Sequence, residues 1–230
     1  MIVSPERYYE EYLKDKNAEQ ILTTIRGLKQ EIGHLKNTME HPEYGKEPIM
    51  HPGESTRLWC TRLYLERAKE ALIEAGGTYT LSQSELKVVV FEKSIPAICK
   101  VVFSIGSFFS EYETRIYTFD DEHLRVDVQN SLIPELTNLN IDLDYTISKK
   151  AFLEGFRELH ISEWRTKYDL RRFGYEMCDG TQWELEIYFS DGHKPVKIYG
   201  DNAYPYNFKE LQELLGMKPY DTEEDEDEEI

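Results

Sequence analysis

The chain has 230 residues, of which 40% are hydrophobic and 13% aromatic, and its formal net charge is −17. This length and apolar content are sufficient for one substantial domain or two small ones, which excludes a chain that is disordered throughout. The longest apolar run, around residues 88–91, is far too short to span a membrane, and the acidic charge disfavours direct binding to nucleic acid.

The first third of the chain is predicted to be helical. A short helix begins after Ser4, which can cap it, because Pro5 suits the first helical position, and it runs to about Asp15. A second helix begins after Asn17, with Gln20 placed to complete a capping box. Its apolar residues recur in steps of four and three and form a narrow heptad-like stripe. The stripe consists of Ile21, Ile25, Leu28, Ile32, Leu35 and Met39.

A loop rich in proline and glycine follows at residues 42–53, and a third helix begins near Glu54 and ends at Gly76-Gly77. Leucines seven residues apart mark the stripe of this helix: Leu58, Leu65 and Leu72. Two stripes joined by a loop predict an antiparallel helical hairpin over residues 1–78. The stripes either pack against each other or on a sheet, or they stay exposed as a face for a partner or a homodimer.

From Leu86 onward the apolar period becomes two, which predicts a sheet domain over residues 79–218. Strands are predicted at residues 88–91, 100–105, 112–119 and 124–128, with Asp120-Asp121 in the turn between the last two. Residues 130–146 are interpreted as a loop. Ser148 then caps a helix that carries Phe152 and Phe156.

Residues 174–200 predict a second hairpin, with Asp191-Gly192 at its turn. In its first strand Trp183, Leu185, Ile187 and Phe189 share one face, and Glu184, Glu186 and Tyr188 share the other. Asn207 caps a last helix that ends at Gly216. The fold class is therefore α+β: an N-terminal helical hairpin, then an antiparallel sheet region with two packed helices.

The end of the chain is strongly acidic. Residues Asp221–Glu229 hold eight carboxylates and no cation, and without them a net charge of about −9 remains. Such a composition predicts that residues 219–230 form a disordered acidic tail. Cations gather in one place, at Arg165-Thr166-Lys167 and Arg171-Arg172, which we interpret as a solvated loop near a helix end.

Residues 179–215 contain the pattern W-x-L-x-I-x-F-x-D-G followed by Y-G-x-N-A-Y-P-x-N-F-x-x-L. This combination resembles the C-terminal part of a family of bacterial and phage-type proteins to which no activity is assigned. The resemblance implies a shared fold and a bacterial or phage-related origin. It implies no catalytic residue.

Candidate contact residues lie in the same stretch: Trp183, Tyr199, Tyr204 and Tyr206. The two tyrosines around Pro205 make a stiff, amphipathic loop of the kind that anchors protein interfaces. The alternative is that these rings pack over the sheet edge and fix the entry into the last helix.

Signs of catalysis are weak. The sequence has no phosphate-binding glycine loop, no hydrolase elbow and no paired-histidine zinc motif, so we expect neither an enzyme nor a cofactor. The densest group of carboxylates and imidazole is Asp120, Asp121, His123 and Asp127. This group would suit a divalent metal, although turn chemistry already explains its first members.

Three functions follow, in order of preference. The first is a non-enzymatic protein-binding module, such as an adaptor, regulator or immunity factor. The second is an acidic inhibitor that imitates nucleic-acid charge, and the third is a metal-dependent hydrolase or nuclease. Because Cys60, Cys99 and Cys178 are scattered and no secretory signal is visible, we expect the cytoplasm and no membrane association.

Overall fold

A computed structural model describes residues 2–46, 51–107, 112–120, 124–130, 147–177 and 179–217. The chain divides into two compact units, Met1–Gln83 and Ser84–Ile230. The predicted α+β class is confirmed, since helices come first and a mostly antiparallel sheet with further helices follows. Among the described residues, no helix is long and apolar enough to cross a membrane.

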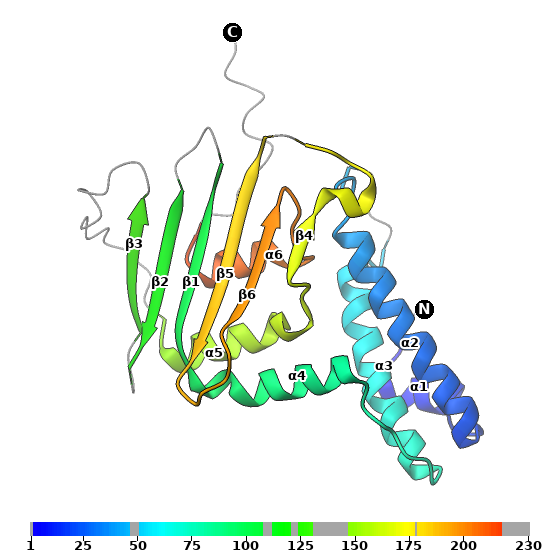
Figure 1. The fold of residues 1–230 in the computed structure, drawn as a ribbon. Helices are drawn as coiled ribbons and strands as arrows, with labels where there is room; N and C mark the ends of the chain where they lie inside the picture. Colours follow the sequence, from blue (N-terminus) through cyan, green and yellow to red (C-terminus); the bar gives the residue numbers. More distant parts are fainter. Residues whose placement is uncertain are drawn as a thin grey trace. The chain divides into compact units, whose positions relative to one another are not determined.

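The first unit is built from three helices: α1 (Pro5–Tyr12), α2 (Ala18–Met39) and α3 (Glu54–Glu74) (Figure 1). The predicted start signals are confirmed. The hydroxyl of Ser4 accepts a hydrogen bond from the Arg7 amide, and Asn17 forms a complete capping box with Gln20. Helix α1 ends at Tyr12, earlier than the predicted end near Asp15.

The apolar stripes of α2 and α3 pack within this unit. Ile21 and Ile25 of α2 are buried in one cluster with Leu65 and Leu72 of α3. Helix α1 joins them through Tyr8, whose ring stacks on Tyr64 at a centroid distance of 4.2 Å. The heptad-like pattern therefore provides the core of the hairpin itself.

The second unit contains a six-stranded sheet in the order β3-β2-β1-β5-β6-β4. Its strands are β1 (Ile98–Ser107), β2 (Glu113–Phe119), β3 (Leu124–Asn130), β4 (Lys167–Asp169), β5 (Thr181–Phe189) and β6 (Val196–Asp201). Its helices are α4 (Gln83–Ser94), α5 (Lys149–Glu158) and α6 (Phe208–Leu214). The pairs are antiparallel except that β4 runs parallel to β6.

Two predictions for this unit are wrong. Residues 88–91 belong to helix α4 and not to a strand, because a short run of consecutive apolar residues fits either structure. Phe91 then enters the core, where its ring meets Phe189 edge-on. Strand β4 was not predicted, because three residues are too few to show a period of two.

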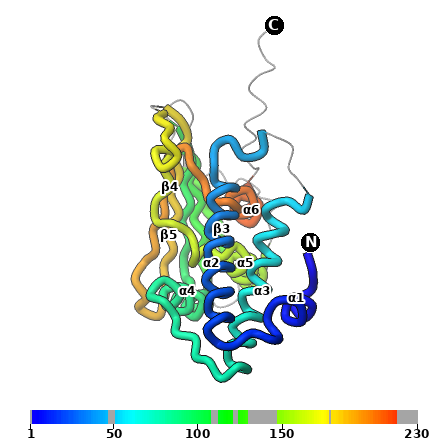
Figure 2. The backbone as a smooth tube through the Cα atoms, turned by 90° about the vertical axis from the view of Figure 1, so that its right-hand side faces the viewer, coloured from blue at the N-terminus to red at the C-terminus, as the bar shows by residue number. Residues whose placement is uncertain are grey.

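One face of the sheet is covered by α5 and α6, which lie behind the strands in Figure 1 and to one side of them in Figure 2. Phe103 and Tyr117 from the strands and Phe152 and Phe156 from α5 are fully buried between these layers. No helix in the described part of this unit covers the opposite face, which we call the open face. Its side chains include Lys100, Ile116, Arg125, Glu184, Glu186, Tyr188, Lys197 and Tyr199.

Hydrogen bonds from β2 hold the C-terminal end of α6 against the sheet. The buried Arg115 of β2 donates from Nη1 to the carbonyls of Leu215 and Gly216, at 3.0 and 2.8 Å. The hydroxyl of Tyr117 donates to the same Leu215 carbonyl at 2.5 Å. Carbonyls at a helix C-terminus lack partners within the helix, so these donors satisfy them, and the Arg115 charge favours the negative end of the helix dipole.

Candidate functional site

Trp183, Gly200 and Ala203, which belong to the sequence pattern in residues 179–215, form one packing unit in the core. Trp183 is 3% exposed, and its Nε1 donates to the carbonyl of Ala203 at 2.9 Å. Gly200 lies directly opposite Trp183 in the β5–β6 register, and a Cβ at Gly200 would overlap the indole nitrogen. The tryptophan therefore requires the glycine opposite it, and the backbone carbonyl of residue 203 fixes its indole nitrogen.

Gly180 packs closely against the side chain of Asn202 in a second contact between these strands. Asn202 adopts a left-handed backbone with φ 50°, and its Oδ1 accepts a hydrogen bond from the Thr181 amide at 2.8 Å. A Cβ at Gly180 would overlap this amide group, and the φ of 154° at Gly180 is itself rare for other residues. This pair fastens the start of β5 to the end of β6.

Asn207 has a different role from the predicted one. It precedes α6, but its side chain makes no capping hydrogen bond to the helix. Instead Nδ2 donates to the Leu159 carbonyl at 2.7 Å, and Oδ1 accepts from Trp164 Nε1 at 3.1 Å. All of these bonds are buried, so the pattern describes how this end of the sheet is assembled.

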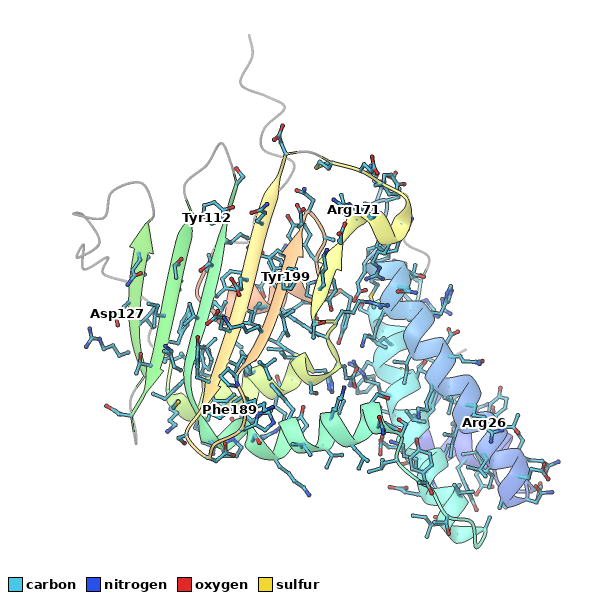
Figure 3. The ribbon with its side chains drawn as sticks, viewed as in Figure 1. Arg26, Tyr112, Asp127, Arg171, Phe189 and Tyr199 are labelled. Atoms are coloured by element: carbon cyan, nitrogen blue, oxygen red, sulfur yellow. The ribbon has the colours of Figure 1, made fainter. Side chains whose placement is uncertain are left out.

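The four predicted contact residues do not share one surface. Trp183 is in the core and has no surface to offer a partner, because strand alternation points it away from the open face. Tyr204 is partly buried against the core, with its ring centroid 4.8 Å from that of Phe208, and Tyr206 is half-buried in the same loop. Tyr199 remains, 47% exposed and labelled on the open face in Figure 3.

Charged side chains surround Tyr199. Its register partners are Glu184 on β5 and Lys167 on β4, and residues opposite each other in a sheet share a face. In the next row, Lys197 forms an ion pair with Glu186, and its Nζ lies 4.0 Å from Glu184.

The neighbouring part of the open face continues this network through β1. The Tyr188 hydroxyl donates to Glu186, and Lys100 Nζ lies 4.2 Å from the centroid of the Tyr188 ring. Sequence reasoning did not identify these residues as a site. The signal was present, because the predicted alternation of β5 already placed Glu184, Glu186 and Tyr188 on one outward face.

These contacts shift the pKa values of Glu186, Tyr188 and Lys197. Partial burial alone would raise the pKa of Glu186, but hydrogen bonds from Lys197 and Tyr188 outweigh it and hold the pKa below the ordinary value. The hydrogen bond to Glu186 raises the pKa of Tyr188, and the same carboxylate raises the pKa of Lys197. At neutral pH the network therefore consists of a carboxylate, an ammonium group and a neutral phenol.

The acidic group proposed for a metal is only partly described. Asp121 and His123 lie outside the described residues, as do Cys178 and the predicted acidic tail. Asp120 is exposed at the end of β2, whereas Asp127 lies within β3 and pairs with Arg125 at 2.8 Å. Within the described ranges, no group of three or more histidine, cysteine or acidic residues could hold a metal ion.

A shallow hollow lies at the ends of β4 and β6, next to the open face. It is lined by Asp169, Leu170, Arg171, Tyr175, Met177, Asp201 and Asn202. It combines two carboxylates, a cation and a phenol without a nucleophile and base placed together, so it gives no observation in favour of catalysis. Comparison with protein-family models, curated proteins and solved structures gave no match to the chain.

Proposed function

We propose that this chain is a non-enzymatic protein-binding module and that the open face around Tyr199 is its docking surface. The observation that carries the proposal is the position of Tyr199. It is 47% exposed on β6, a strand hydrogen-bonded on both sides, so its ring stands on a rigid platform. A tyrosine held in this way offers a large amphipathic contact at a low entropic cost, as in many interface hot spots.

The charges of the open face favour a protein over a nucleic acid as the partner. Arg125 and Lys197 are each paired with a carboxylate of the same face, Asp127 and Glu186 respectively. A surface that binds phosphates uses its cations for the phosphates, whereas Arg125 and Lys197 are neutralised by carboxylates of their own face. A mixed polar surface with an aromatic anchor matches the composition of transient protein interfaces.

Within this class, an adaptor, a regulator or an immunity-type factor of bacterial or mobile-element origin fits the resemblance found in residues 179–215. A cytoplasmic setting is supported by Cys60 and Cys99, which are both free thiols. A homodimer formed through the helical unit would use residues outside the two stripes, because the stripes already pack within that unit.

The test is affinity capture from bacterial lysate with the full chain, comparing Tyr199→Ala with Tyr12→Ala. Tyr12 is a matched control, 51% exposed on α1. We expect one stoichiometric protein partner, retained by the control and weakened about tenfold or more by Tyr199→Ala, as for a hot-spot residue. Equal capture by both variants would exclude the open face as the docking surface.

A second candidate, an acidic inhibitor that imitates nucleic acid, is favoured by where the charge lies. Residues 84–230 contain 16 basic and 31 acidic residues, whereas residues 1–83 contain 11 and 13. The acidity thus belongs almost entirely to the sheet unit. The test is the affinity of the captured partner for the chain, measured at rising salt concentrations. Charge mimicry predicts a steep loss of affinity with salt, and an affinity independent of salt contradicts it.

A further inference from the structure

The two ends of the sheet differ in how far they can pair with another strand. At one end, β4 is three residues long and continues into a turn of 3₁₀ helix, Leu170–Phe173, where the sequence predicts a solvated loop. At the other end, β3 is seven residues long and pairs with β2 residue for residue (Figure 1). Its sequence is LRVDVQN, without the proline or lysine that often blocks an edge strand. Within the described residues, no strand pairs with its outer side.

The side chains on the covered face of β3 are apolar and incompletely buried. Leu124 and Val126 pack against the core of the sheet unit, and both are only half-buried. Val128, the next residue of this face, is half-buried as well. A strand added along β3 would cover the apolar surface that these side chains leave exposed.

The side chains on the open face of β3 are of opposite charge. Arg125 is 77% exposed and Asp127 is 40% exposed, and they form an ion pair within the strand at 2.8 Å. Their register partners on β2 are Thr118 and Ile116, which carry no charge. This edge therefore presents one cation and one carboxylate, two residues apart.

A second copy of β3 matches this edge in one register. When two identical strands pair antiparallel about a two-fold axis between their Val126 residues, each residue lies opposite one that is equally far from Val126. Arg125 of each copy then lies opposite Asp127 of the other, and Leu124 lies opposite Val128. A two-fold axis at Arg125 or at Asp127 would instead place that residue opposite its own charge, which is unfavourable.

We propose that this chain forms a homodimer through β3, in the register centred on Val126, so that the two sheets join into one. The pairing gives hydrogen-bond partners to the backbone groups on the outer side of β3, covers its apolar side chains and adds two ion pairs across the two-fold axis. The strand pairing does not depend on the proposed function. That the dimer offers two open faces on the same side to a partner does rest on it.

The net charge of −17 on each copy opposes this association but does not prevent it. At about 0.15 M ionic strength the Debye length is about 8 Å, so charges farther apart than this are largely screened. Side chains directly opposite each other in a sheet are only about 5 Å apart at Cβ, so their attraction persists.

Two charge reversals test the proposal, because the register makes each variant incompatible with itself and compatible with the other. Arg125→Asp leaves only carboxylates at the two positions, and Asp127→Arg leaves only guanidinium groups. Sedimentation velocity of the full chain at about 0.15 M salt, where long-range repulsion is screened, measures the dimer dissociation constant. We expect the original chain to dimerise and each variant to raise this constant at least about tenfold, because like charges then face each other.

An equimolar mixture of the two variants is the decisive measurement. Neither variant keeps the ion pair within its own strand, yet Arg125→Asp in one copy faces only cations in an Asp127→Arg copy. The mixture should therefore regain a dissociation constant within about threefold of the original one. Native mass spectrometry identifies the heterodimer, since the two variants differ in mass.

Arg171→Asp is the matched control, because it makes the same change of charge at an arginine that is 76% exposed at the other end of the sheet. Figure 3 labels Arg171 there and Asp127 on β3. This variant should change the dissociation constant by less than about twofold, and circular dichroism establishes that every variant is folded. A chain that stays monomeric, single variants that dimerise like the original chain, or a mixture that does not associate would each overturn the proposal.

Discussion

The two faces of the sheet are made by the same strands and differ completely in chemistry. On β5, Leu185 and Ile187 are fully buried, while Glu184 and Glu186, which alternate with them along the strand, point to the open face. The buried face is aromatic, closely packed and covered by α5 and α6, and the open face is polar and ion-paired. One face therefore forms the core of the sheet unit, and the other carries the surface that we propose for docking.

This contrast explains the structural role of the sequence pattern in residues 179–215. The described residues that define it, such as Trp183, Gly200 and Asn207, act on the buried side, through packing and hydrogen bonds between segments. A protein can keep all of these and still carry a different open face. The residues of the pattern in residues 179–215 therefore concern the fold, and the proposed partner has to be inferred from the open face.

The largest expected loss of stability comes from a substitution in the buried face of the sheet. Trp183→Ala should lower the free energy of unfolding by about 3–5 kcal/mol, because it leaves a large cavity and frees the carbonyl of Ala203. Urea unfolding followed by circular dichroism measures the change. Tyr199→Ala, on the open face, is the matched aromatic control and should cost less than about 1 kcal/mol. Similar losses for both variants would contradict the division between the faces.

An intermediate effect is expected at the polar junction behind the sheet. Asn207→Ala should cost about 2–4 kcal/mol, because the indole N–H of Trp164 and the carbonyl of Leu159 both lose a buried partner. The same unfolding measurement applies. The exposed neighbour Lys209→Ala should stay within about 0.5 kcal/mol of the original chain. A loss below about 1 kcal/mol for Asn207→Ala would show that water replaces these bonds.

The smallest change in the free energy of unfolding should come from a substitution on the open face, and this change should depend on pH. Glu186→Gln should cost less than about 1 kcal/mol at neutral pH, since Lys197, its ion-pair partner, is 56% exposed and solvent screens the pair. The pKa of Glu186 is below its ordinary value of 4.5 in the folded chain. Its stabilisation is therefore present above that value and is lost as the pH falls through the folded pKa.

The measurement is the free energy of unfolding of both chains, from neutral pH down to about pH 3. Their difference should shrink toward zero as the carboxylate of the original chain takes up its proton. A difference that grows on acidification would reverse the assigned direction of the pKa shift. Glu184→Gln provides the control, because Glu184 lies 4.0 Å from Lys197 and forms the weaker contact.

Local patterns predicted much of the fold. The capping box at Asn17, the helix after Ser148 and the alternation of β5 each depend on neighbours in sequence, and the structure confirms them. Residues 88–91 and β4 were missed because their state depends on tertiary packing and on pairing with distant β6. Trp183 was misjudged as a contact residue although its own alternation with Glu184 already placed it on the apolar face. Tyr199, the other predicted contact residue on these strands, is exposed, and its role in contact stays a prediction. Its network with Lys197 and Glu186 could not be predicted, because it requires the register of β5 and β6.

The fastening of α6 to β2 has a consequence for the order in which the chain can fold during synthesis. Arg115 and Tyr117 find their partners at Leu215 and Gly216, about one hundred residues later, and β1 waits for β5 to complete its second side. The helical unit can fold once residue 83 has left the ribosome, whereas the sheet unit lacks part of its core until residue 217 has done so. A chain whose synthesis ends in between consists of the helical unit joined to an incomplete sheet whose aromatic face lacks its α6 cover.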